Sequence, residues 1–123
     1  MDRVLDTQRP LYEVKANLFK GLSHPFRVRI LELLAADEEV CVGDLLQDTG
    51  LEPSHLSQHL SVLRRHHLVT SQRRGSQVFY RLAFPEIAEL LRVARSLLGE
   101  VLRDTLDRLT LVDPDPSTGD DLR

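Results

Sequence analysis

The side chains best suited to chemistry in this chain are the polar and cationic ones of residues 51–82, and the chemistry they suit is anion binding. This stretch holds five arginines and one carboxylate, Glu52, so its formal net charge is +4, whereas the 123-residue chain carries −3. The arginines are Arg64, Arg65, Arg73, Arg74 and Arg81. A local surplus of cations favours an anionic macromolecule as the binding partner.

A helix is predicted to begin at Pro53, because Leu56, Leu60 and Leu63 repeat at helical spacing and form one apolar face. The opposite face carries short donors and acceptors of the kind that read base edges in the major groove, and nearby arginines suit phosphates. We predict DNA contacts from Ser54, His55, Ser57, Gln58, His59, Ser61, Arg64, Arg65, Arg73, Arg74 and Gln77. A half-buried structural histidine is the alternative for His59, and a merely solvated face is the alternative for the helix.

The segments on either side of this helix favour the DNA-binding interpretation. Before it, a short apolar-periodic helix ends at Gly50, which predicts a helix-turn-helix over about residues 42–66. After it, the hydrophobic period changes to two on both sides of a turn at Arg74-Gly75, which predicts a two-stranded wing over about 68–83. A polar helix followed by a basic hairpin is the expected layout of a DNA-binding domain.

The remaining elements complete a mainly α fold with a small β-hairpin. Apolar residues at helical spacing predict a first helix from Pro10, ended by Gly21 and Ser23, and a second helix from Pro25. The same periodicity predicts a long last helix from Pro85, whose wide apolar stripe favours self-association. We therefore expect one domain over 10–111, with about five helices and the wing. An acidic tail, 112–123, is expected to be disordered.

Composition argues against several other functions. The one cysteine, Cys41, cannot form an intrachain disulfide and belongs to no Cys/His cluster, so zinc-finger and disulfide scaffolds are excluded. Cys41 is either a small buried hydrophobe or a thiol sensor at the start of a helix. No apolar run approaches a membrane span, and no catalytic constellation is visible. We expect a cytoplasmic protein that is not an enzyme.

Four ordered segments carry a family resemblance: 22–31, 41–45, 56–63 and 75–82. Together they resemble the ArsR/SmtB family of bacterial winged-helix repressors. The resemblance implies a homodimer built from the first and last helices, with the fourth helix in the major groove and the wing on flanking DNA. It also implies a repressor that binds an inverted-repeat operator and is released by an effector.

The chain departs from the metal-sensing members of that family. They carry Cys-Val-Cys where this sequence has Cys41-Val42-Gly43, and the last helix lacks the histidines of a second family site. The sequence therefore identifies no metal-binding residues and implies no certain cofactor. A transition-metal ion and a thiol-reactive species both stay open as the effector. An effector-independent regulator and a winged-helix module for protein contacts are the alternatives.

Overall fold

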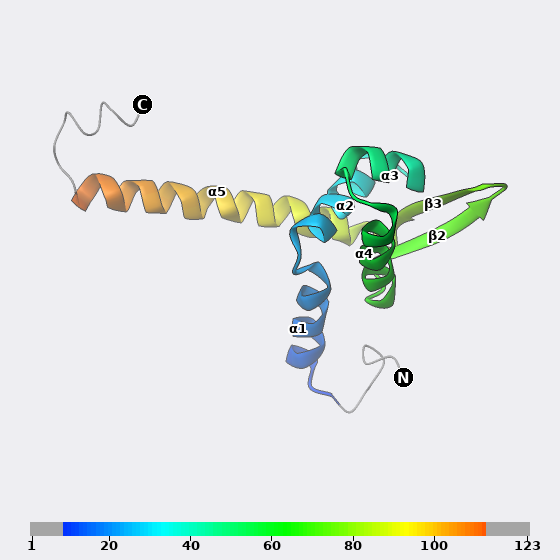
Figure 1. The fold of residues 1–123 in the computed structure, drawn as a ribbon. Helices are drawn as coiled ribbons and strands as arrows, with labels where there is room; N and C mark the ends of the chain where they lie inside the picture. Colours follow the sequence, from blue (N-terminus) through cyan, green and yellow to red (C-terminus); the bar gives the residue numbers. More distant parts are fainter. Residues whose placement is uncertain (1–8, 113–123) are drawn as a thin grey trace. The chain divides into compact units, whose positions relative to one another are not determined.

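The computed structural model describes residues 9–112, and its elements confirm the predicted fold (Figure 1). The helices and strands, in chain order, are α1 Leu11–Leu22, α2 Pro25–Ala36, β1 Val40–Cys41, α3 Val42–Thr49, α4 Pro53–Arg65, β2 Val69–Arg74, β3 Gln77–Leu82 and α5 Glu86–Val112. Val112, assigned to the tail from sequence, is the last residue of α5. The rest of the predicted tail, 113–123, lies outside the described residues.

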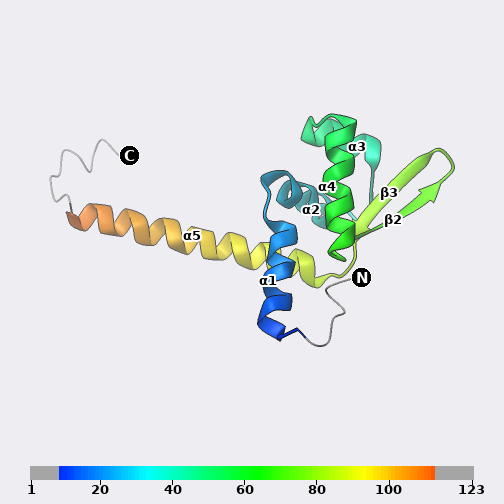
Figure 2. The same cartoon turned by 60° about the horizontal axis from the view of Figure 1, so that its bottom comes forward.

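The chain divides into two units, one ending at Ala88 and the other beginning at Glu89. The first unit contains α1 to α4, the three strands and the start of α5, and the second contains the remainder of α5. Figure 2 shows the first unit with α4 passing in front of α2 and the β2–β3 hairpin projecting from the helices. None of the described helices is both long and apolar enough to cross a bilayer.

The core of the first unit lies between α2, α3, α4 and the base of the sheet. Its fully buried side chains are Ile30, Leu31, Leu34, Leu45, Leu56, Leu63 and Val69. Burial of this apolar area is the main favourable term in folding, at roughly 25 cal/mol per Å². The predicted apolar face of α4 is confirmed, because Leu56, Leu60 and Leu63 are all buried.

Local signals set several helix ends as predicted. Pro25 and Pro53 occupy the first turns of α2 and α4, where a missing N–H costs no helical hydrogen bond. Gly50 ends α3 with φ 70°, and its N–H donates to the Leu46 carbonyl oxygen at 2.9 Å. Only glycine enters this left-handed region without a steric cost, so α3 turns sharply into the start of α4.

Gly21 has a different role from the predicted one. It lies inside α1, and Ser23 is the residue that caps the helix. Gly21 is buried, and a Cβ built on it would lie 2.7 Å from Cγ of His66 and 2.9 Å from Cβ of His66. The glycine is therefore required by the close approach of α1 to the end of α4.

The sheet has one strand more than the predicted two-stranded wing. Its order is β1-β3-β2, with antiparallel pairing throughout. Val40 of β1 pairs with Tyr80, and Cys41 pairs with Phe79. A strand of two residues is too short to show an alternating pattern, so periodicity could not reveal it. This strand joins the segment after α2 to the base of the wing.

Candidate nucleic-acid interface

The polar face of α4 is exposed along most of its length. Small or planar polar side chains lie on it near the N-terminal end, and two arginines lie near the C-terminal end. The exposed residues predicted to contact DNA are Ser54, His55, Ser57, Gln58, Ser61, Arg64 and Arg65. With its leucines buried, α4 presents to solvent only side chains that can form hydrogen bonds or ion pairs along this face. The dimensions of an α-helix match those of the B-DNA major groove.

The end of α4 directs the chain into the wing. His67 adopts φ 61°, and the Leu68 N–H donates to the Leu63 carbonyl oxygen at 2.9 Å. This bond spans five residues, and a second one runs from the His67 N–H to the Arg64 carbonyl oxygen at 3.0 Å. The pair forms a Schellman motif, with Leu68 and Leu63 buried beneath it. The motif fixes the direction in which β2 leaves α4.

The wing presents further predicted site residues at its tip. Arg73 and Gln77 are exposed, and Gly75 forms the tight turn with φ 62°. One contact links helix and wing, because Arg64 Nη1 lies 3.5 Å from Ser71 Oγ. The arginines at the end of α4 and at the tip of the wing therefore extend one exposed polar surface, which we call the α4–wing face and define as the exposed residues among 54–65 and 70–77.

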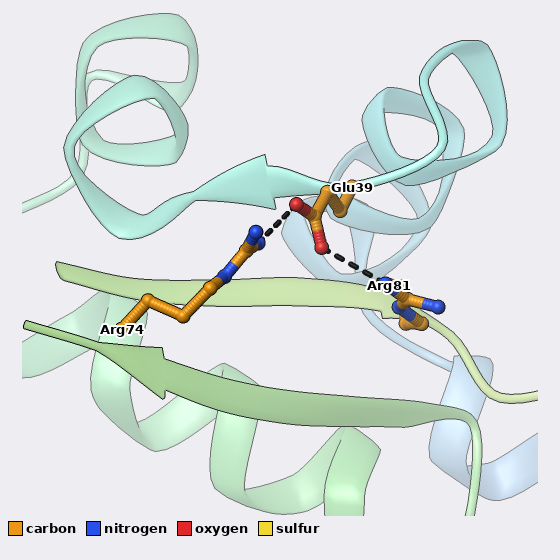
Figure 3. Close-up of polar contacts among 3 residues, drawn as sticks. All are labelled: Glu39, Arg74 and Arg81. Carbon is orange, nitrogen blue, oxygen red and sulfur yellow. Dashed lines mark hydrogen bonds and ion pairs between the residues drawn. The ribbon is translucent and has the colours of Figure 1, made fainter.

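Arg74 does not stand alone at the tip of the wing. Its guanidinium binds Glu39 Oε1 and lies over the Phe79 ring, 4.0 Å from the ring centre (Figure 3). The other oxygen, Glu39 Oε2, accepts a hydrogen bond from Arg81 Nη2 at 2.9 Å. Hydrogen bonds from Arg74 and then Arg81 hold the pKa of the Glu39 carboxyl below its usual value. A charge count over residues 51–82 misses this carboxylate, since it comes from the segment before β1.

His59 is half-buried, which is one of the two alternatives predicted for this residue from the sequence. Its ring centre lies 4.4 Å from that of His24 and 6.2 Å from that of Phe26, both at the start of α2. Burial lowers the pKa of His59, with smaller contributions from the charges of His24, Arg27 and His55. The neutral imidazole is therefore the form that packs against α2.

Cys41, the candidate sensor thiol, is half-buried at the junction of β1 and α3. Its Sγ lies on the side of Gly43, at 3.9 Å from the position a Cβ would take there. Across residues 9–112, no three side chains of His, Cys, Asp or Glu gather closely enough to hold a metal ion. The described residues thus contain one half-buried thiol and no ready-made metal cluster within a single chain.

Comparison with known proteins agrees with this arrangement. The family model described as "Bacterial regulatory protein, arsR family" matches residues 24–71. The HTH-type transcriptional regulator Rv0081 of Mycobacterium tuberculosis is 54% identical over 96 residues, which cover 77% of this chain and 83% of the relative. The crystal structure of Rv0081 matches with a TM-score of 0.74 and 52% identity, over 80% of this chain and 98% of that one.

Two further solved structures resemble the chain. The transcriptional repressor BigR from Xylella fastidiosa matches with a TM-score of 0.65 and 38% identity, over 75% of this chain and 92% of that one. The homodimeric winged helix-turn-helix DNA-binding domain of Mb0332 from Mycobacterium bovis matches with a TM-score of 0.68 and 29% identity. That match covers 77% of this chain and 87% of the domain.

A helix-turn-helix made by α3 and α4, followed directly by a β-hairpin, defines a winged helix-turn-helix transcriptional regulator. The chain belongs to the ArsR family of bacterial regulatory proteins.

Proposed function

We propose that residues 10–111 form a homodimeric, cytoplasmic repressor that binds an inverted-repeat operator and has no enzymatic activity. The observation that carries the proposal is the α4–wing face, where exposed hydrogen-bonding side chains of one helix continue into exposed arginines of the adjoining hairpin. Phosphate contacts would supply most of the affinity, and base-edge contacts would supply the sequence preference.

The side chains of this face divide into two roles by position and chemistry. Ser54, Ser57 and Gln58 lie in the N-terminal half of α4, where their short or planar groups suit base edges. The cations Arg64, Arg65 and Arg73 suit phosphates on either side of the groove. His55, Ser61, Arg74 and Gln77 complete the proposed contact set.

Self-association is supported by exposed apolar side chains on the first and last helices. In α1 these are Leu11, Tyr12, Leu18 and Phe19, and in α5 they are Val93, Leu97, Leu98, Val101, Leu102, Leu106 and Leu109. Exposed apolar area of this extent is typical of a protein interface. The homodimeric domain of Mb0332 supports a second copy as the partner, and the repressor BigR supports repression as the outcome.

Release by an effector forms part of the proposal, and two chemical classes compete for that role. A thiol-reactive species would act at Cys41, which is half-buried and lies two residues before Gly43, in the first turn of α3. A metal ion would need ligands in addition to those of one chain's residues 9–112, where no cluster of three His, Cys, Asp or Glu side chains exists. Titrating the protein–DNA complex with metals, oxidants and persulfides separates the two classes. Release by one agent, abolished by Cys41→Ser, would assign the thiol.

Selection from a random duplex library tests the DNA-binding proposal. We expect enrichment of an inverted repeat whose half-sites lie about 10 base pairs apart, centre to centre. Affinity for the selected duplex should fall steeply with salt, since bound cations release counterions from DNA. A protein that enriches no sequence and forms no salt-dependent complex with duplexes would instead fit a module for protein contacts.

A further inference from the structure

The Glu39 carboxylate sits between two wing arginines because of the sheet register. Val40 pairs with Tyr80 in antiparallel fashion, so the preceding residue, Glu39, continues opposite Arg81. Arg74 comes from the far end of β2, and Figure 3 shows its side chain running back along β3 to reach the same carboxylate. One acid therefore gathers one cation from the base of the wing and one from its tip.

The contact with Arg74 is of a kind that DNA phosphate can replace. The Arg74 side chain is 47% exposed and that of Glu39 is 24% exposed, so both groups lie at the surface. A guanidinium binds carboxylates and phosphates through the same planar set of N–H donors. When a phosphate replaces the Glu39 carboxylate, Arg74 thus forms hydrogen bonds of the same kind, and its guanidinium moves back toward the tip of the wing.

Arg81 differs from Arg74 in its place on the strand. It lies near the end of β3, paired with Thr70, whereas Arg74 pairs with Gln77 beside the turn. Arg81 is thus placed to keep Glu39 when Arg74 leaves. After the exchange, the carboxylate would still have a cationic partner, and no buried charge would be created.

We propose that Glu39 is a positioning residue that competes with DNA phosphate for Arg74, so that the free protein withholds one cation from the α4–wing face. The inference rests on the proposed DNA-binding function. Its consequence is a lower affinity for duplex DNA of any sequence, because each binding event must first displace the Glu39 carboxylate. The competition limits non-specific binding, which depends on phosphate contacts alone.

Fluorescence anisotropy with a labelled mixed-sequence 30-base-pair duplex tests the proposal across a range of salt concentrations. We expect Glu39→Gln to tighten binding by about two- to fivefold, the equivalent of one exposed ion pair. The slope of log affinity against log salt should change by much less than the value of about 0.9 for one phosphate contact, because Arg74 binds a phosphate in both complexes and only the cost of displacing Glu39 is removed. Glu38→Gln is the matched control, since it removes the same charge from a residue that forms no ion pair within residues 9–112.

An Arg74→Gln background distinguishes competition from general repulsion. If Glu39 acts by holding Arg74, Glu39→Gln should change affinity by less than about 1.5-fold in that background, because the coupling between the two residues is gone. A gain that persists there, or an equal gain from Glu38→Gln, would overturn the proposal. Unchanged or weaker binding by Glu39→Gln in an otherwise wild-type protein would overturn it as well. Failure of the wild-type protein to bind any duplex would refute the proposed function itself.

Discussion

The contact between Gly21 and His66 makes a sharp prediction about how α1 is held against the end of α4. In Gly21→Ala the new Cβ would lie 2.7 Å from Cγ and 2.9 Å from Cβ of His66, whereas ordinary contacts begin at 3.4 Å. Rotation of the His66 side chain cannot move its own Cβ away. The helices themselves must therefore separate by several tenths of an ångström.

Two opposing terms set the size of the effect. Alanine is favoured over glycine inside a helix by about 1 kcal/mol, and that term would stabilise the variant. Overpacking of a close contact costs about 1–3 kcal/mol, and here it acts on two atoms of one side chain. We expect Gly21→Ala to lower the free energy of unfolding by about 1 kcal/mol on balance.

Urea unfolding at a fixed protomer concentration measures this change, since the stability of a dimer depends on concentration. In a His66→Gly background, which lacks both Cβ and Cγ at residue 66, Gly21→Ala should instead stabilise the protein by up to about 1 kcal/mol, because only the helix propensity remains. Gly43→Ala is the matched control in α3, where a Cβ would meet nothing closer than the Cys41 Sγ at 3.9 Å. Stabilisation by Gly21→Ala in the wild-type background, equal to that of Gly43→Ala, would refute the close packing of α1 on α4.

Four other outcomes follow from the site and the core. Gln58→Ala should weaken binding to a selected operator more than to mixed-sequence DNA, because a base-edge contact carries specificity; equal losses would remove that role. Arg73→Ala should lower affinity for all duplexes and flatten the salt dependence by about one phosphate, whereas Arg74→Ala should lower affinity less, since Arg74 must first give up its contact with Glu39. Leu63→Ala should cost about 2–5 kcal/mol of stability in urea unfolding, because Leu63 is fully buried. Because the pKa of His59 is lowered in the folded protein, this histidine is protonated at a higher pH in the unfolded chain, and the free energy of unfolding should fall as pH drops below about 6.5. His59→Gln should flatten that pH dependence. A variant with the same pH profile as the wild-type protein would contradict the packing of the neutral ring.

Local patterns predicted the elements that present the α4–wing face. The leucine spacing of α4 defines its buried side whatever the rest of the fold. Steric reasons also explain the proline that begins α4 and the glycine that ends α3 before it. The change of period after Leu68 likewise predicted β2 and β3. These features depend on residues close together in the chain, so they can be predicted from the sequence.

Three features depend on residues far apart in the chain and escaped prediction. The strand β1 has two residues and exists because β3 pairs with it. Glu39 reaches the wing only through that pairing, so a charge count within 51–82 overestimates the free cations there. Gly21 resembles a helix-ending glycine in sequence, yet the packing of His66 determines its place inside α1.

The most direct test of the central claim is an amide NMR titration of the protein with duplex DNA. We predict that chemical-shift changes will concentrate in residues 54–65 of α4 and 70–77 of the wing, and that they will reverse when salt is added. Shift changes confined to other parts of the chain, with α4 and the wing unaffected, would contradict the claim that the α4–wing face binds DNA.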